Sequence, residues 1–339
     1  MNKWIFFLIT LIIICIIVAP ILKVASRTGK ATGKEIIKLG TLAPKESDWG
    51  KMLQLMSAEL IEESGEQLQF KLQFGRDEED LTKPRRQFDV VSLTATGLGQ
   101  VLRASFIFQL PMLFKTYDEL DCVRSELTPE FSKMFDAEGY VLLGWGDLGF
   151  INLFSKKPIK TQADLKETRL WVWDIDQITQ KFASESGKTP ITLPIRSVRL
   201  ALKNGDIQTV YTSPYGCIAL GWHPEVKYMS DLRLAAGVGA TIISKKRYDK
   251  LSDKHQDLLR KIAKKYHEPL VTTIREKNNE SIGILERKYI EVIHVPHTEE
   301  EKWLQVAKQV QDHFAGQLYK KELLDKVRSL LAKYRKDER

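Results

Sequence analysis

The chain has 339 residues, of which 43% are hydrophobic and 28% are charged, and its formal net charge at pH 7 is +8. This length is long for a single core and suits two domains. Lysine and arginine are interspersed with glutamate and aspartate along amphipathic stretches, as on a solvated surface, so nucleic acid is not an expected partner.

The N-terminal segment reads as an export signal. Residues 4–22 are uncharged and almost all apolar, and Lys3 precedes them. A positive start followed by an apolar run is typical of such signals. Small residues at 24–26 favour cleavage, which would remove residues 1–26. The alternative is a retained membrane anchor, because the run is about long enough to span a bilayer. Both alternatives place the rest of the chain in the periplasm.

The next stretch alternates strands and helices. Ile36 to Leu42 reads as a strand, and a helix with apolar residues at helical spacing extends from Ser47 to Gly65. Leu68 to Phe74 and Phe88 to Leu93 read as two more strands. This order indicates an α/β layer with a largely parallel sheet.

The segment from Thr94 to Gly99 follows the third strand, and we expect it to be a turn. Its backbone and hydroxyls, including that of Thr94, could face a ligand. It lacks the lysine of a phosphate-binding loop, so phosphate is not expected there.

A helix over residues 117–139 precedes an extended stretch over residues 140–154. Three glycines between positions 144 and 149 permit bending or a close approach of another segment. Asp147 lies among them and is a candidate polar contact to a ligand. The alternative is a turn aspartate that caps backbone amides.

The stretch from Leu170 to Trp173 alternates as a half-buried strand should. Trp171 and Trp173 share one face, while Leu170 and Val172 share the other. Aromatic surface of this size forms either a core or the wall of a ligand pocket.

The rest of the chain predicts a second α/β unit and then several helices. Val238 to Ser244 reads as a strand that returns to the first domain. Ser252 to about Ile290 reads as one long helix, with a kink at Pro269. A capping box at Thr298 starts a further helix, and a last one covers residues 321–334.

Several motifs along the chain have a familiar order and spacing. They are Ser155-Lys-Lys-Pro-Ile159, Asp164-Leu-Lys-Glu-Thr-Arg-Leu-Trp-Val172, Ala201-Leu-Lys-Asn-Gly-Asp-Ile207 and Ser213-Pro214. Together they resemble substrate-binding proteins of TRAP-type transporters, the DctP-like family, over roughly residues 36 to 290.

The resemblance implies an α/β, two-lobed periplasmic-binding-protein fold, type II-like, with a long bracing helix and C-terminal helices. Domain I would comprise residues 35–152 and 238–256, and domain II residues 153–237. Residues 257–339 would form the long helix and the C-terminal helices. The ligand would bind between the two lobes.

The resemblance also puts Cys122 and Cys217 in different domains, so we expect two free thiols rather than a disulfide. His294 and His297 lie on an extended stretch with proline between them, which does not bring them onto one face. Together with the lack of a Cys-x-x-Cys pair, this argues against a metal site. No cofactor is expected.

In the family, the arginine that ends the second motif grips the ligand carboxylate through two parallel hydrogen bonds. This chain has Trp171 at that position, while Arg169 falls on the family's lysine and points away from the pocket face. The resemblance also marks Lys157 as a second basic contact and Ser213 as the match to a side-chain amide. An indole supplies apolar area and one N–H donor but no countercharge.

Four further aromatic residues join Trp171 in the predicted site. They are Trp145, Tyr211, Tyr215 and Trp222. For Trp145 and Trp222 a place in the core is the alternative. If the five converge, the cleft is aromatic, and we expect a larger or more apolar ligand than a C4-dicarboxylate.

The leading functional hypothesis is an extracytoplasmic solute-binding receptor of a TRAP-type system. It would capture an organic acid or a more apolar ligand and deliver it to permease subunits in the membrane. The alternative is a periplasmic lipid or hydrophobe carrier that works with a different membrane transporter. An enzyme is disfavoured, because the sequence offers no Ser/His/Asp set, paired carboxylates, metal motif or dinucleotide fingerprint.

Overall fold

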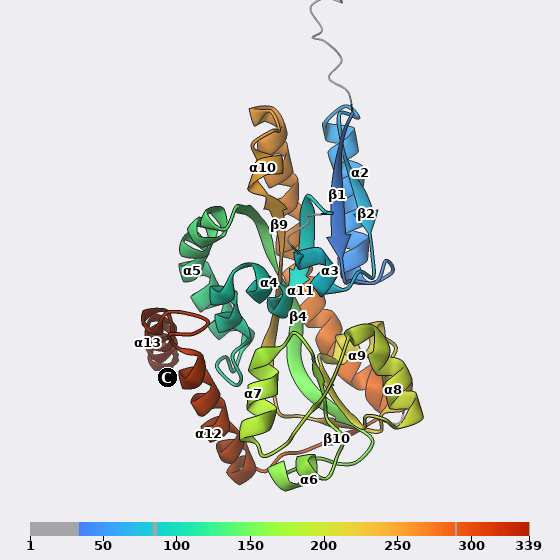
Figure 1. Cartoon of the computed structure of the whole chain (residues 1–339), viewed down its shortest axis with the longest axis vertical. Coiled ribbons are helices and arrows are strands. Elements are labelled where there is room, and N and C mark those ends of the chain that lie inside the picture. Colours follow the sequence, from blue (N-terminus) through green and yellow to red (C-terminus); the bar gives the residue numbers. More distant parts are fainter. Residues whose placement is uncertain (1–33, 84–86, 289, 339) are drawn as a thin grey trace, which may run out of the picture.

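The computed structural model describes residues 34–83, 87–288 and 290–338 (Figure 1). The predicted export signal or anchor lies outside these residues. Among the described helices, none is both long enough and apolar enough to cross a membrane. The fold is mixed α/β, built on one eight-stranded sheet in the order β10-β8-β4-β9-β3-β1-β2, with β7 beside β4 and a separate β5-β6 pair.

The first part of the chain forms the group of elements that we call lobe I. β1 (Glu35–Thr41) lies between two parallel neighbours, β2 (Leu68–Gln73) and β3 (Val90–Thr94). Apolar β1 residues pack against α2 (Asp48–Glu63) because Ile37 and Leu39 share a core with Leu53 and Met56. Lobe I also contains α3 (Glu78–Thr82), α4 (Ala95–Val101), η1 (Arg103–Gln109) and α5 (Tyr117–Ala137).

Two long strands carry the chain between the lobes. β4 (Tyr140–Ser155) pairs with the antiparallel strand β9 (Ala235–Ser244) along most of its length. The last residues of β4 instead pair with β7 (Thr209–Thr212) and β8 (Tyr228–Ser230). The predicted extended stretch is therefore one continuous strand that belongs to both lobes.

The glycines of β4 permit a close approach, as predicted. A Cβ atom on Gly146 would lie 2.3 Å from the Trp49 ring, and Gly149 has a φ of +94° with Asn278 against it. The pairing with β9 shifts register between Leu142 and Gly144 and again between Asp147 and Gly149. Such irregularities bend a strand and change the face to which later side chains point.

Lobe II gathers around the last part of β4, in the lower half of Figure 1. Its remaining elements are α6 (Gln162–Lys166), β5 (Trp171–Trp173), α7 (Gln177–Glu185), β6 (Ile191–Leu193), η2 (Ile195–Ser197), α8 (Val198–Asn204), α9 (Pro214–Ala219) and η3 (His223–Glu225). β5 and β6 pair in parallel, and Leu170 forms a bridge to Thr209, the first residue of β7. The two-lobed α/β architecture confirms the predicted fold class, whereas the domain boundaries given above stay a prediction.

The predicted bracing helix is α11 (Asp253–Arg287), which follows α10 (Lys245–Tyr248). It packs against α2 in lobe I, against β4 and against α9 in lobe II. The helix continues through Pro269. After β10 (Glu291–Ile293), α12 (His297–Phe314) stacks Trp303 on Phe182 of α7 at 5.8 Å, and α13 (Lys321–Asp337) packs on α5.

Two local expectations are wrong and a third is confirmed. The segment after β3 is the short helix α4 rather than a turn, because the Thr94 hydroxyl accepts a hydrogen bond from the Gly97 amide and caps it. α12 begins after Pro296 without a side-chain cap, so the predicted capping box at Thr298 is wrong. Cys122 and Cys217 are free thiols, as expected.

Candidate ligand-binding site

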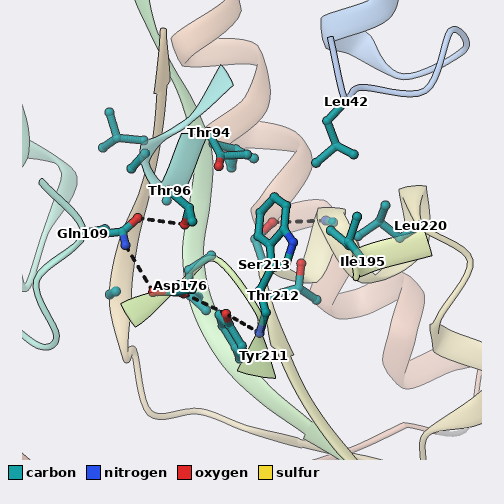
Figure 2. Close-up of a pocket in the computed structure, with 18 of the residues that line it drawn as sticks. Leu42, Thr94, Thr96, Gln109, Asp176, Ile195, Tyr211, Thr212, Ser213 and Leu220 are labelled. Atoms are coloured by element: carbon teal, nitrogen blue, oxygen red, sulfur yellow. Dashed lines mark hydrogen bonds between the residues drawn. The ribbon is translucent and has the colours of Figure 1, made fainter. Parts of the chain in front are cut away.

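A cavity of about 230 Å³ lies between the two lobes (Figure 2). Lobe I contributes the loop after β1 and the junction of β3 with α4, and lobe II contributes β5, the end of β7 and the start of α9. β1 and β3 are parallel, so their carboxyl ends open toward the same edge of the sheet. In open α/β sheets this edge is where ligands bind.

Trp171 is the centre of the aromatic wall. Its ring stacks on Tyr211 at 5.2 Å with an interplanar angle of 24°, and Trp222 meets it edge-on at 5.4 Å. The residue is only 1% exposed, and its indole N–H donates to the carbonyl of Leu193 at 2.9 Å. Trp171 is therefore both a core residue of lobe II and part of the cavity wall, and its one polar donor is already engaged.

The predicted alternation along β5 agrees with the packing. Trp171 and Trp173 both line the cavity and share one core cluster, while Leu170 and Val172 pack in another. Tyr211 contacts the same strand, since its hydroxyl accepts a hydrogen bond from the amide of Trp173 at 3.3 Å.

Thr94, Ser213 and Tyr215 also line the cavity, as the sequence suggested. Ser213 caps α9, because its hydroxyl accepts a hydrogen bond from the Gly216 amide at 3.1 Å. The Tyr215 hydroxyl reaches across the lobes and donates to Asp48 of α2 at 2.8 Å. Burial, aided by the neighbouring Asp48 carboxylate, raises the pKa of Tyr215 to about 12, which keeps this donor protonated at neutral pH.

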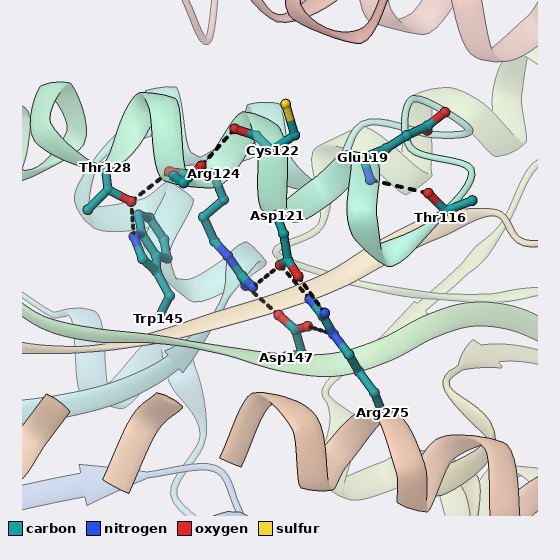
Figure 3. Close-up of polar contacts among 10 residues, drawn as sticks. Thr116, Glu119, Asp121, Cys122, Arg124, Thr128, Trp145, Asp147 and Arg275 are labelled. Carbon is teal, nitrogen blue, oxygen red and sulfur yellow. Dashed lines mark hydrogen bonds and ion pairs between the residues drawn. The ribbon is translucent and has the colours of Figure 1, made fainter. Parts of the chain in front are cut away.

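Three other candidates do not line the cavity. Trp145 packs in the core against Phe108 at 5.2 Å, and its N–H donates to Thr128 at 3.0 Å. Lys157 is exposed beyond the end of β4. Asp147 is fully buried in an ion cluster, and Figure 3 shows it between Arg124 and Arg275.

Three polar residues that sequence reasoning did not select lie on the cavity wall. Glu78 from α3 accepts hydrogen bonds from the Thr94 amide at 2.5 Å and the Thr94 hydroxyl at 2.8 Å. Asp176 caps α7, and the Gln109 amide donates to it across the lobes at 3.4 Å. Glu78 stands in a run of four acidic residues that resembles a solvated surface, so the sequence carried no signal of its burial.

Burial dominates the electrostatics of both carboxyl groups. Desolvation raises the pKa of Glu78 to about 7, despite the hydrogen bonds from Thr94 that favour the ionised form. Desolvation also raises the pKa of Asp176 and, together with the Asp176 charge, holds that of Tyr211 well above its usual value.

The described part of the cavity wall offers no countercharge to an anion. Among the described residues that line it, none is lysine, arginine or histidine. The buried side-chain nitrogen and oxygen atoms of these described lining residues all have hydrogen-bond partners within the protein. Most of the wall is aliphatic or aromatic, so the site is suited to apolar contact.

A two-lobed α/β chain with a cavity between its lobes has the architecture of a solute-binding receptor. The model of the family described as bacterial extracellular solute-binding protein, family 7 (DctP) matches residues 39–317, and the chain belongs to this family. The family predicted from the sequence motifs is thereby confirmed.

Solved structures support the same fold. A TRAP periplasmic solute-binding protein from Xanthobacter autotrophicus Py2 with bound β-D-galacturonate is 20% identical, with a TM-score of 0.80 over 87% of this chain and 99% of that one. One from Ralstonia eutropha H16 with bound (S)-2-acetolactate is 18% identical, with a TM-score of 0.82 over 88% and 99%. A third, from Haemophilus influenzae RdAW with L-gulonate, is 20% identical, with a TM-score of 0.79 over 89% and 99%.

Proposed function

We propose that this chain is the periplasmic receptor of a TRAP-type transport system. It captures a small, mainly apolar solute in the cavity between the lobes and delivers it to a membrane permease. Membership of the DctP family supports the receptor role. The position of the cavity, with walls from both lobes, supports capture by closure of one lobe on the other.

The composition of the cavity wall carries the choice of solute. The acids bound in the three related structures each bring a carboxylate. The sequence resemblance puts Trp171 at the position of the family's carboxylate-binding arginine, and no cation lines the described part of the cavity. An unpaired carboxylate in such surroundings would lose its hydration without compensation. Burying an apolar group as large as one side chain instead contributes roughly 1.5 to 3 kcal/mol.

The solute can be identified by native mass spectrometry of the protein purified from its own host. Tryptophan fluorescence then measures affinity, because Trp171 and Trp173 line the cavity. We expect apolar solutes to bind, and succinate, malate and galacturonate to bind weakly or not at all. Tight binding of succinate that persists in Trp171→Ala would contradict the apolar cavity.

Delivery is tested separately. The receptor is added to vesicles that contain the TRAP permease subunits of the same host, with the solute identified above. Uptake that depends on the receptor supports the proposal. Uptake by the permease without the receptor would argue that the chain serves a different transporter.

A further inference from the structure

Several hydroxyl groups of the cavity wall donate their protons to carboxyl groups of the protein. The Thr94 hydroxyl donates to Glu78 at 2.8 Å, and the hydroxyls of Thr179 and Tyr211 each donate to Asp176 at 2.7 Å. A hydroxyl that gives its proton to a carboxylate keeps only its lone pairs for other partners. These three side chains can therefore offer acceptors, but no donors, to a solute.

Other polar groups on the wall also donate their hydrogen bonds to acceptors of the protein. The Thr96 hydroxyl donates to the Gln109 side-chain oxygen at 3.1 Å, and the Gln109 amide donates to Asp176 at 3.4 Å (Figure 2). The Tyr215 hydroxyl donates to Asp48 at 2.8 Å. At these positions the cavity meets a solute with oxygen lone pairs rather than with donors.

The acidic side chains of the cavity wall favour the same kind of solute, one that donates hydrogen bonds. Glu78 is fully buried and Asp176 is 3% exposed, and neither forms an ion pair with any described residue. The chain as a whole carries a formal charge of +8, so the acidic character is local to the cavity. A buried carboxylate without a cation is costly, and a cation from outside would relieve that cost.

The aromatic residues favour the same class of partner. Aromatic faces attract organic cations through their quadrupole, most strongly when the cation is desolvated. Six tryptophan and tyrosine residues line the cavity, namely Trp49, Trp171, Trp173, Tyr211, Tyr215 and Trp222.

We propose that the solute is an organic cation, in which a protonated amine is attached to an apolar body. The amine donates hydrogen bonds to the lone pairs at the Glu78 and Thr94 end of the cavity. The apolar body packs on the aromatic wall of lobe II. This proposal rests on the proposed receptor function and names its solute class. An ammonium group carries only donors and a carboxylate only acceptors, so the wall distinguishes the two by hydrogen-bond direction as well as by charge.

Three probes with one apolar body test the proposal: 2-phenylethylamine, 2-phenylethanol and phenylacetate. Calorimetric titration of the full chain at neutral pH should rank the amine first, the alcohol second and the carboxylate last. A hydrogen bond to a charged group predicts about 10- to 100-fold tighter binding of the amine than of the alcohol. Equal binding of amine and alcohol would overturn the cation proposal and leave an apolar-solute receptor in place. Tightest binding of the carboxylate would overturn the apolar receptor itself.

A variant assigns the effect to Glu78. Glu78→Gln should remove most of the preference for the amine over the alcohol, while the affinity for the alcohol changes little. Asp80→Asn is the matched control, because Asp80 loses the same charge on the same helix but lies outside the cavity, paired with Lys83. An unchanged preference in Glu78→Gln overturns the assignment. If that variant does not fold, Thr94→Val removes the other acceptor at the same end of the cavity and makes the test instead.

Discussion

At the scale of single residues, Trp171 belongs both to the core of lobe II and to the wall of the cavity. The family pattern placed it in the binding site, and the structure adds that Tyr211, Trp222 and the Leu193 carbonyl fix its orientation. Because the ring is enclosed on these sides, it is a rigid part of the wall.

This enclosure predicts the effect of truncation. Trp171→Ala should lower the free energy of unfolding by about 3 to 5 kcal/mol, because it leaves a void between Tyr211 and Trp222. Trp171→Phe keeps most of the ring and should lose less, chiefly the hydrogen bond to Leu193. Urea denaturation measures both values. An equal loss in the two variants would show that the N–H, rather than the ring, stabilises the lobe.

Glu78 predicts an unusual dependence of stability on pH. Its pKa is about 7 in the folded chain and 4.5 in the reference state, so the unfolded chain ionises first as the pH rises. Its contribution to stability is therefore full below pH 4.5 and is lost as the pH rises through 7, by about 3 kcal/mol. Gln cannot titrate, so the stability of Glu78→Gln relative to wild type should increase over this range. Urea denaturation at a series of pH values checks it, and a difference independent of pH would contradict the prediction.

At the scale of elements, the regular strands and the amphipathic helices were predictable from periodicity. β1, β2, α2 and α11 lie close to their predicted ranges, because each buries one apolar face. α4 was not predictable, because its sequence contains two glycines. It is stabilised instead by the Thr94 cap and by the distant Glu78 beneath it.

The irregular pairing of β4 explains why some predicted site residues lie elsewhere. Register shifts on both sides of Trp145 and Asp147 change the face to which β4 side chains point. Alternation read from the sequence therefore could not decide between cavity and core. The partners of Asp147 lie 23 and 128 residues away, so no local pattern indicated its ion cluster either.

That cluster joins three elements and predicts a large stability effect. Asp147 of β4 pairs with Arg124 of α5 and with Arg275 of α11, and Arg275 also pairs with Asp121 at 2.6 Å (Figure 3). Asp147→Ala leaves two largely buried guanidinium groups short of countercharge, so the free energy of unfolding should fall by about 3 to 5 kcal/mol.

The control is an exposed ion pair on α11, the helix that carries Arg275. Lys277 of α11 pairs with Glu280 at 3.0 Å on the surface. Lys277→Ala should leave the midpoint of urea denaturation almost unchanged. Similar losses in both variants would mean that the buried cluster contributes no more than a surface pair.

At the scale of the whole molecule, the cavity is closed by hydrogen bonds that connect the lobes on two sides. Tyr215 donates to Asp48 between α9 and α2, and Gln109 donates to Asp176 between η1 and α7. The rim adds an ion pair between Arg196 and Asp77. A solute that contacts both lobes would stabilise the closed form together with these contacts, because only the closed form has the complete cavity.

Removal of the two hydrogen bonds should shift the equilibrium toward an open form. Each bond contributes about 1 kcal/mol, so Tyr215→Phe combined with Gln109→Met should weaken solute binding by up to roughly thirtyfold. Small-angle scattering of the solute-free chain should give a larger radius of gyration. Tyr228→Phe is the control, because Tyr228 lies in β8 outside the cavity, and it should change neither quantity. Weaker binding without any change in the radius of gyration would assign the two side chains to solute contact, and the closure mechanism would then be wrong.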